Sequence, residues 1–288
     1  MSVSQNLPSV VPTAPDLLPA RADHGYDLEA LGTALAGTPF AGHLHHSAEI
    51  ASTNTEALEQ GAIGAPHGSV YLADVQTAGR GRGGHNWSSA AGAGLYVSIL
   101  LRPSLAPGDA LWYSLAAGLA VLAAVRATTG LVPDLRWPND LLFGNRKVAG
   151  ILTEMHAEAT RVRHLVIGVG INVHQLQFPA ALASQATSLA MEGGHTTRQE
   201  LLAAFLGALE YETGLLASGD AARAQHMLLT RLEAASSWVR GKRVVVDQLP
   251  GGPFEGVTAG LDNRGFLQVR TAEGMRRVLS GGVRAQER

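Results

Sequence analysis

Apolar and β-branched residues recur along the chain in runs that predict strands and helices. Residues 70–75 and 94–101 are β-prone and predict two strands on either side of a connecting loop. Residues 109–129 form a long, alanine-rich apolar stretch, which predicts a helix packed on the sheet. Residues 162–173 are almost wholly apolar, as in a strand that is buried on both faces.

The remaining patterns divide the chain into three parts. Residues 1–40 predict a disordered, Pro-, Ser- and Ala-rich extension with one short helix over 26–35. Residues 41–237 predict a domain of mixed sheet and helices, whose further helices begin at Ser52 and near 197 and 221. Residues 238–288 predict a small β-barrel, because short strands alternate there with Gly, Asp and Asn turns. Its expected strands cover 243–246, 254–257, 266–269 and 275–278.

The dipeptide Gly144-Asn145 predicts a two-residue hairpin turn between two strands. Side chains alternate between the faces of a strand, so that Asp140 and Lys147 are expected on one face. Taken alone, this is an ordinary neighbourhood of opposite charges across two strands. The register predicted by the turn pairs Phe143 with Arg146, Leu142 with Lys147, and Asp140 with Ala149.

Composition narrows the class of protein. The 288 residues carry a formal net charge of −2, which provides no basic field for nucleic acid. The chain has no cysteine, which excludes disulfides, thiolate metal sites and a cysteine nucleophile. We expect no run of about 18 apolar residues that could span a membrane, and no signal peptide at the N-terminus. A soluble cytoplasmic protein is the expectation.

Lysine is rare in this chain. Of the 22 basic residues only Lys147 and Lys242 are lysines, and the others are arginines. A lysine retained against this bias is a candidate for chemistry that needs a compact ammonium group. The bias can equally reflect genomic composition, and Lys242 is expected to be a surface residue at the edge of the barrel.

Residues 76–87 join the first two predicted strands through a glycine-rich loop. Glycines at 79, 81, 83 and 84 let the backbone approach a ligand closely, and its N–H groups suit an anion. Arg80 and Arg82 add guanidinium groups that match phosphate or carboxylate, and Trp87 suits an apolar lid. The alternative is a flexible surface loop. The string matches neither a Walker loop nor a Rossmann fingerprint.

The string G-R-G-R-x-G-x-x-W, preceded by Q-x-A, resembles the nucleotide and biotin loop of the biotin protein ligases. Three further strings are similar to signatures of that family and occur in the family's order: S-T-N at 52–54, W-P-N-D at 137–140 followed by K-x-A-G-I-L-x-E at 147–154, and G-x-G-I-N-V at 168–173. The resemblance extends from Ser52 to about Leu189, together with the C-terminal barrel. The loop departs from the pattern at Gly83 and His85, where many bacterial members carry arginines.

This resemblance implies an α+β fold: a class II synthetase-like biotin/lipoate ligase domain with a mixed sheet and helices, followed by a small SH3-like barrel. It implies an ATP-dependent, AMP-forming carbon–nitrogen ligase that uses biotin, ATP and Mg²⁺. The enzyme would activate biotin as biotinyl-5′-AMP and transfer it to a lysine of a biotin carboxyl carrier protein. The type expected is monofunctional, without an N-terminal DNA-binding domain, nucleic-acid partner or membrane partner; a homodimer is left open.

The resemblance also implies roles for individual residues. Lys147 would bridge the biotin carboxylate and the α-phosphate, with Arg82 beside it. Asp140 would act in the second step as a base or a group that positions the amine. No residue is assigned to a metal. The biotin- and nucleotide-binding residues that it implies are Ser52, Thr53, Asn54, Gln76, Gly79, Arg80, Gly81, Arg82, Trp87, Asn139, Lys147, Gly150, Ile151, Gly170 and Asn172.

Other readings remain open on the sequence. A lipoate–protein ligase would share the fold plan, but its loop orders arginine and glycine differently. A DNA-binding repressor is disfavoured by net charge and by the absence of a reading helix in 1–40. The histidines at 43, 45 and 46 suit a metal site less well than a strand with exposed imidazoles.

Overall fold

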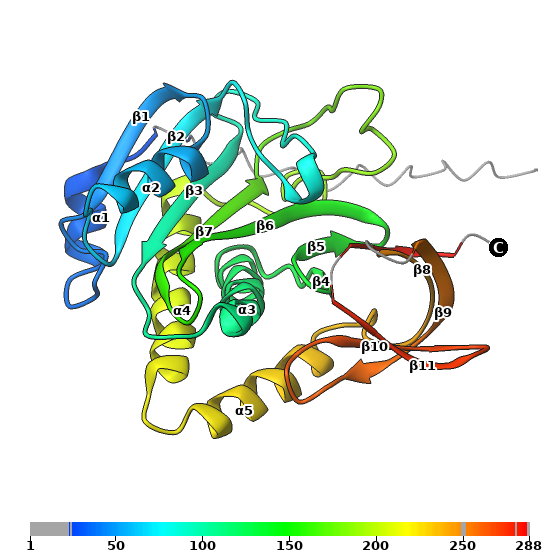
Figure 1. The fold of residues 1–288 in the computed structure, drawn as a ribbon. Helices are drawn as coiled ribbons and strands as arrows, with labels where there is room; N and C mark the ends of the chain where they lie inside the picture. The colour runs from blue at the N-terminus through cyan, green and yellow to red at the C-terminus, as the bar shows by residue number, and fades with distance from the viewer. Residues whose placement is uncertain (1–22, 24, 249–251, 280, 287–288) are drawn as a thin grey trace, which may run out of the picture.

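The computed structural model describes residues 23, 25–248, 252–279 and 281–286, which build two β-sheets with helices around the larger one (Figure 1). The larger sheet has seven strands in the order β1-β2-β3-β7-β6-β5-β4. Only β1 and β2 are parallel, so the sheet is mixed, as predicted. Its strands are β1 (Leu44–Ile50), β2 (Ser69–Gln76), β3 (Gly94–Leu101), β4 (Asp134–Arg136), β5 (Asp140–Phe143), β6 (Arg146–Ala157) and β7 (Val162–Asn172).

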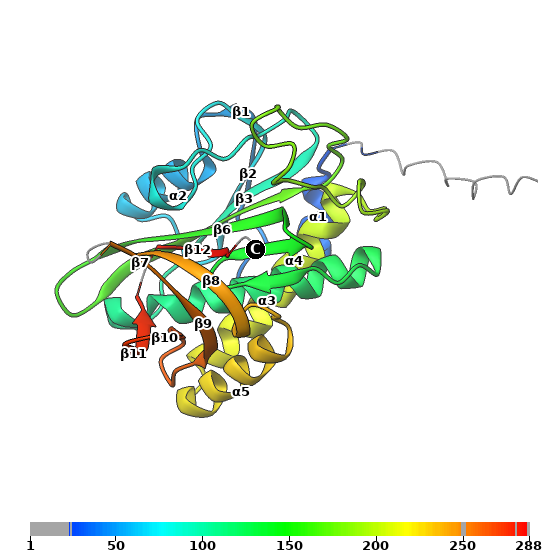
Figure 2. The ribbon, with the colours of Figure 1, turned by 90° about the vertical axis from the view of Figure 1, so that its right-hand side faces the viewer.

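Helices cover both faces of this sheet. In Figures 1 and 2, α2 lies on one face, whereas α3 and α4 lie on the other. Strand β3 is buried along its whole length, because helices cover both of its faces. The helices are α1 (Leu28–Ala34), α2 (Thr53–Ala62), α3 (Ala110–Thr129), α4 (Arg198–Ala217) and α5 (Ala221–Ala234), with short 3₁₀ turns η1 (Arg82–Gly84) and η2 (Pro107–Asp109).

Helix α3 corrects one expectation from the sequence. We expected no apolar run long enough to span a membrane, but Pro107–Thr129 has the length and a mean hydropathy of 1.6. Most of this stretch is buried inside the protein, where it packs between the sheet and α4. Burial on nearly all sides explains why the helix is apolar all round, and α3 is therefore a core helix.

Part of the N-terminal region belongs to the main core. Helix α1 is shorter than the predicted 26–35 and begins after Asp27, whose side chain accepts from the Ala30 N–H. Leu31, Leu35 and Phe40 are buried in the same apolar cluster as the sheet. Residues 1–22 and 24 lie outside the described residues, so the disordered tail stays a prediction, as does the boundary at 41.

The C-terminal residues form a second, antiparallel sheet of five strands in the order β11-β10-β9-β8-β12. The four strands predicted here are confirmed, three of them with wider bounds and that at 266–269 beginning one residue later and ending at Thr271; β12 was not predicted. The fold class is thus a mixed-sheet domain followed by a small all-antiparallel one. The strands are β8 (Arg240–Gln248), β9 (Gly252–Leu261), β10 (Leu267–Thr271), β11 (Gly274–Val278) and β12 (Gly282–Ala285).

The hairpin of β5 and β6 contains a bulge that the sequence did not reveal. The pairs next to the turn, Phe143–Arg146 and Leu142–Lys147, are confirmed. The predicted pair of Asp140 with Ala149 is wrong, because Asp140 pairs with Gly150 and Leu141 with Ala149. Val148 is the extra residue of this bulge and is fully buried in the core. Asp140 and Lys147 nevertheless meet.

An ion pair between a buried carboxylate and a partly exposed arginine joins α4 and α5 and gives a test of the packing. Glu212 is 3% exposed, and Arg231 is its cationic partner. We expect Arg231→Met to lower the free energy of unfolding by about 2–4 kcal/mol, because a buried carboxylate would lose its counter-charge. Urea denaturation measures the loss. The control Arg163→Met removes an exposed pair with Glu158 and should cost at most about 1 kcal/mol; equal losses would contradict the prediction.

Candidate active site

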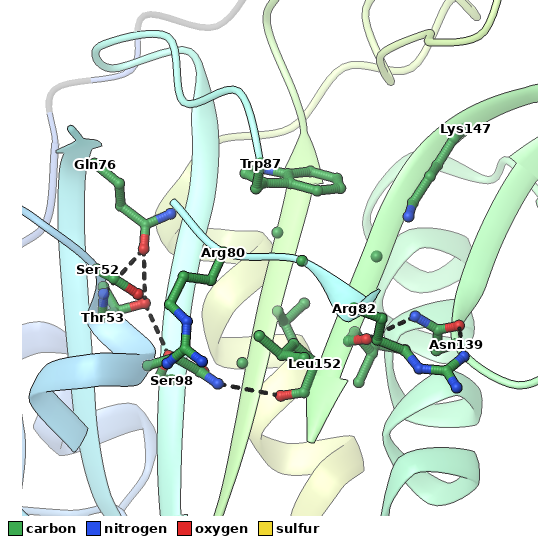
Figure 3. A pocket seen from close by; sticks show the side chains of 17 residues that line it. Ser52, Thr53, Gln76, Arg80, Arg82, Trp87, Ser98, Asn139, Lys147 and Leu152 are labelled. Carbon is green, nitrogen blue, oxygen red and sulfur yellow. Dashed lines mark hydrogen bonds between the residues drawn. The ribbon is translucent and has the colours of Figure 1, made fainter. Parts of the chain in front are cut away.

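A pocket lies where the loop after β2 folds over β6 and β7 (Figure 3). Side chains from the start of α2, from β3 and from the β5–β6 hairpin complete the wall. The lining residues are Ser52, Thr53, Asn54, Gln76, Arg80, Gly81, Arg82, Trp87, Ser98, Asn139, Lys147, Gly150, Ile151, Leu152, Gly168, Val169 and Gly170.

The glycine-rich loop is folded into a small hairpin of its own. The Gly81 N–H donates to the His85 carbonyl at 2.7 Å, and the Trp87 N–H donates to the Gly79 carbonyl at 2.8 Å. At its tip, Gly83 and Gly84 have φ values of +64° and +79°, a region that side chains disfavour. The glycines therefore serve the turn that returns the chain over the pocket.

Trp87 covers the pocket from above, as an apolar lid should (Figure 3). Its ring reaches the sheet because two positions beneath it lack side chains. A Cβ at Gly170 would lie 2.4 Å from Trp87 Cε2, and one at Gly150 would lie 2.9 Å from Cζ3. Glycine at these two positions is thus required by the close approach of the indole.

One end of the pocket carries uncharged hydrogen-bonding groups. The Thr53 N–H and hydroxyl donate to Gln76 Oε1 at 2.9 and 3.1 Å. Ser52 caps α2, with its hydroxyl accepting from the Thr55 N–H. Ser98 Oγ lies 2.8 Å from Thr53 Oγ1 and was missed by the sequence analysis. A serine in the otherwise apolar strand 94–101 was the available signal.

Asn54 is held at the same end of the pocket by groups from three strands. Its Nδ2 donates to Glu154 Oε2 at 2.8 Å, and its Oδ1 lies 2.7 Å from Ser98 Oγ. A Cβ at Gly168 would lie 2.0 Å from Asn54 Oδ1. Gly168 therefore leaves room for the amide of Asn54. Glu154 also pairs with Arg80 at 2.6 Å.

The opposite end of the pocket is cationic. Arg82 donates from Nη1 to Asn139 Oδ1 at 2.9 Å, and Asn139 donates from Nδ2 to the Ile151 carbonyl at 2.8 Å. Burial lowers the pKa of Arg82, while the charge of Asp140 opposes that shift. Lys147 Nζ lies 5.4 Å from the Trp87 ring centroid. Arg82 and Lys147 thus face one end of the pocket, whereas the cation at the other end, Arg80, is neutralised by its pair with Glu154 (Figure 3).

Asp140 lies behind Lys147 and is absent from the pocket lining. Its Oδ1 is 2.6 Å from Lys147 Nζ, and its Oδ2 is 2.5 Å from Arg136 Nη2. Burial acts to raise the pKa of Asp140, but Lys147 and Arg136 outweigh it and hold the pKa below its usual value. A carboxylate of lowered pKa is a poor proton acceptor, so this geometry favours the positioning role over the role of a base.

The other predicted residues fall into two groups. Those named from the sequence line the pocket, apart from Asp140, Gly79 and Asn172. A Cβ at Gly79 would lie 2.6 Å from the Trp87 carbonyl, so this glycine closes the loop. Asn172 donates to the Thr187 carbonyl at 2.9 Å and holds the neighbouring segment. The lining residues outside the predicted set are Ser98, Leu152, Gly168 and Val169.

The histidines near β1 are engaged with neighbouring side chains. His45 stacks on Tyr71 with 5.0 Å between ring centroids, and His46 Nε2 lies 3.0 Å from Asp74 Oδ2. Within the part of the chain that the structure describes, no group of three or more His, Cys, Asp or Glu residues is arranged to hold a metal ion.

Comparison with known proteins gives concordant matches. Residues 47–172 match the model of the biotin/lipoate A/B protein ligase family, and residues 240–283 match that of the biotin protein ligase C-terminal domain. The chain is 34% identical over 248 residues to the bifunctional ligase/repressor BirA of Bacillus spizizenii, covering 84% of this chain and 73% of that protein. It is 37% identical over 226 residues to the biotin–[acetyl-CoA-carboxylase] ligase of Mycobacterium tuberculosis, covering 76% of this chain and 80% of that protein.

Solved structures give the same match. The biotin protein ligase of Aquifex aeolicus in complex with biotin and ATP superposes with a TM-score of 0.72 at 29% identity, covering 85% of this chain and all of that chain.

Gly168→Ala tests the packing of Asn54. The added methyl group collides with the Asn54 amide, so we expect the free energy of unfolding to fall by about 1–3 kcal/mol. Urea denaturation measures the change. The matched control is Gly207→Ala in the exposed middle of α4, where a Cβ meets open space; there alanine should stabilise by about 0.5–1 kcal/mol. A stabilising effect at both positions would show that Asn54 moves aside freely.

Proposed function

The chain belongs to the biotin protein ligase family, and on that premise we propose how its residues carry out the reaction of that family. The protein is a biotin–[acetyl-CoA-carboxylase] ligase that acts through biotinyl-5′-AMP. The observation that carries the assignment of residues is the charge distribution of the pocket: Lys147 and Arg82 lie at one end, and at the other Arg80 is neutralised by Glu154 among uncharged hydrogen-bonding groups.

Biotin has the matching polarity. Its ureido ring is uncharged and both donates and accepts hydrogen bonds, while its valeryl chain ends in a carboxylate. We therefore place the ring at Ser52, Thr53, Asn54 and Gln76, and the carboxylate near Lys147. Trp87, Gly150, Ile151 and Gly170 would cover the apolar part of the molecule. An apolar cover also keeps water from a reactive adenylate.

In the first step a carboxylate oxygen of biotin attacks the α-phosphorus of ATP, and pyrophosphate leaves. Two anions must approach each other, so cations prearranged at the meeting point lower the barrier. Lys147 is the group we place between the carboxylate and the α-phosphate, and Arg82 is the second cation. Asn139 supports this role, because it fixes the guanidinium of Arg82 through the hydrogen bond at 2.9 Å.

In the second step the amine of a carrier lysine attacks the acyl carbon, a C–N bond forms, and AMP leaves as the C–O bond breaks. We propose that the partner is a biotin carboxyl carrier domain of a biotin-dependent carboxylase. Asp140 would keep Lys147 in place through both steps, since its lowered pKa leaves it ionised. The proton lost by the amine then passes to solvent or to phosphate.

The metal ion, the compartment, the domain bounds and the oligomeric state are proposed as well. We propose that Mg²⁺ enters with ATP, since Mg²⁺ commonly binds through substrate phosphates with few protein ligands; Asp140 and Glu154 are each already engaged by a cation. We propose that the enzyme is cytoplasmic and that it consists of a catalytic unit, residues 41–237, and a C-terminal unit, residues 238–288. Whether it forms a homodimer is left open.

Exchange of labelled pyrophosphate into ATP tests the function directly. We expect exchange that depends on biotin, because adenylation is reversible and the neutral end of the pocket suits a ureido ring. Lipoate, which has a dithiolane ring without hydrogen-bond donors, should support at most a few per cent of that rate. Exchange with lipoate and none with biotin would instead identify a lipoate ligase.

Lys147→Arg tests the need for a compact ammonium. The variant keeps the charge, but a planar guanidinium is bulkier and fits poorly between a carboxylate and a phosphate. We expect pyrophosphate release with saturating biotin and ATP to fall roughly a hundredfold, about 3 kcal/mol of transition-state stabilisation.

The internal control is the second lysine. Lys242 Nζ lies 4.7 Å from the Trp238 ring centroid, a contact that arginine also makes. Lys242→Arg should therefore retain the wild-type rate. A Lys147→Arg enzyme as fast as the wild type would mean that the lysine is a compositional accident.

A further inference from the structure

Arg136 is a charged neighbour of the site that the proposed mechanism does not use. Arg136, at the end of β4, donates to Asp140 Oδ2 at 2.5 Å, while Lys147 Nζ lies 2.6 Å from Asp140 Oδ1. Asp140 is mostly buried, with 14% of its side chain exposed. Each oxygen of one buried carboxylate is thus assigned to a different cation, only one of which lines the pocket.

Arg136 also contacts the C-terminal part of the chain. Its guanidinium carbon lies 5.3 Å from the ring centroid of Trp238, which is 3% exposed and comes just before β8. A cation over an indole from which water is excluded is held in place by the ring. The ring therefore restrains the guanidinium that restrains Asp140.

The backbone around Arg136 is held by the same C-terminal segment. The Leu135 N–H donates to the Ala235 carbonyl at 3.3 Å, and the Ser237 N–H donates to Asp134 Oδ1 at 2.9 Å. After Arg136, the Trp137 indole N–H donates to the Gly265 carbonyl, in the turn between β9 and β10, at 2.9 Å. Arg136 is thus anchored on both sides by residues that precede or belong to the small sheet.

The balance of charge shows what Arg136 does for Lys147. With Arg136 present, two cations share one carboxylate, and the group keeps a net positive charge beside the pocket. Without Arg136, both oxygens of Asp140 are free to turn to Lys147, which neutralises the ammonium and draws it away from the pocket. The field that an anionic reaction centre needs is then weaker.

We propose that Arg136 and Trp238 are positioning residues for Lys147, acting through Asp140, and that the C-terminal sheet is coupled to adenylation by this chain of contacts. The proposal rests on the role proposed above for Lys147. It assigns the small sheet a task inside the catalytic unit itself, which is to hold the ammonium at the pocket.

A double-mutant cycle between Arg136 and Asp140 tests the proposal. In the full-length chain, Arg136→Met should lower kcat for biotin-dependent pyrophosphate release by about tenfold or more, and Arg136→Lys should recover part of the loss. In the Asp140→Asn background no carboxylate remains to be shared, so Arg136→Met should then change the rate less than about twofold. If Arg136→Met acted through a general structural defect, it would lower kcat by the same factor in the wild-type and Asp140→Asn enzymes. That outcome would overturn the proposal.

A second cycle tests the link to Trp238. Trp238→Phe keeps an aromatic face and should retain most of the rate, whereas Trp238→Leu should lower kcat by about fivefold. Added to Arg136→Met, Trp238→Leu should cause no further loss, because its effect passes through the arginine. If the losses in kcat from Arg136→Met and Trp238→Leu multiply in the double variant, the link is wrong. It is also wrong if Trp238→Phe is folded by circular dichroism but is as slow as Arg136→Met. If Trp238→Leu fails to fold, the Phe variant decides.

The matched control is another arginine that has a carboxylate and an aromatic ring as partners. Arg277 Nε lies 2.7 Å from Asp262 Oδ2, and its guanidinium carbon lies 5.7 Å from the Phe266 ring. Arg277→Met removes the same kinds of contact, but the carboxylate that it frees does not contact Lys147. This variant should therefore retain the wild-type kcat.

The wild-type enzyme distinguishes a failure of the proposed function from a failure of the positioning role of Arg136. If it shows no biotin-dependent exchange, the proposed function is wrong. If it does, and Arg136→Met equals it, only the positioning role is wrong.

Discussion

A buried carboxylate must be balanced by cations, and the balance at Asp140 connects the parts of this protein. Asp140 begins β5, Lys147 lies on β6, and Arg136 ends β4, so one charge group ties three strands at the edge of the large sheet. The group then reaches the C-terminal sheet through Trp238. Leaving the mostly buried carboxylate of Asp140 without a cation would cost several kcal/mol. The positions of the hairpin, of the small sheet and of the catalytic lysine are therefore mutually dependent.

The other half of the site depends on glycines, whose lack of a side chain leaves room for neighbouring groups. Gly150 and Gly170 let the Trp87 ring approach the sheet, and Gly168 lets Asn54 do the same. Each glycine weakens its strand slightly, because it contributes no packing and has more conformational entropy to lose. The sheet compensates for this with β3 and β7, which are buried almost throughout. A rigid apolar sheet thus provides a floor on which polar and aromatic groups from α2 and the loop can be set closely.

Much of this was predictable from the sequence, since long elements carry strong patterns. The bounds of β3 and the cap at Ser52 were predicted from local signals alone, and the strings around the pocket identified most of its lining. The register of Asp140 was not predictable, because the turn signal gives the pairs next to the turn and does not reveal the extra residue Val148. Ser98, Glu154 and Arg136 were missed for a related reason: each acts through a partner far away in the chain, such as Asn54, Arg80 or Trp238.

The charges in the loop show how much of the chemistry depends on Lys147. Of the two arginines in the loop, Arg80 is paired with Glu154, which leaves Arg82 as the loop arginine directed at the pocket without a carboxylate partner among the described contacts. Gly83 and Gly84 adopt positive φ and make the turn, so the loop's shape is obtained at positions that carry no charge. His85 adds a cation only when it is protonated. Electrostatic stabilisation of two approaching anions therefore falls mainly to Arg82 and Lys147. Because Lys147 shares Asp140 with Arg136, its charge remains available at the pocket, and this sharing lets a loop with few cations serve an anionic reaction.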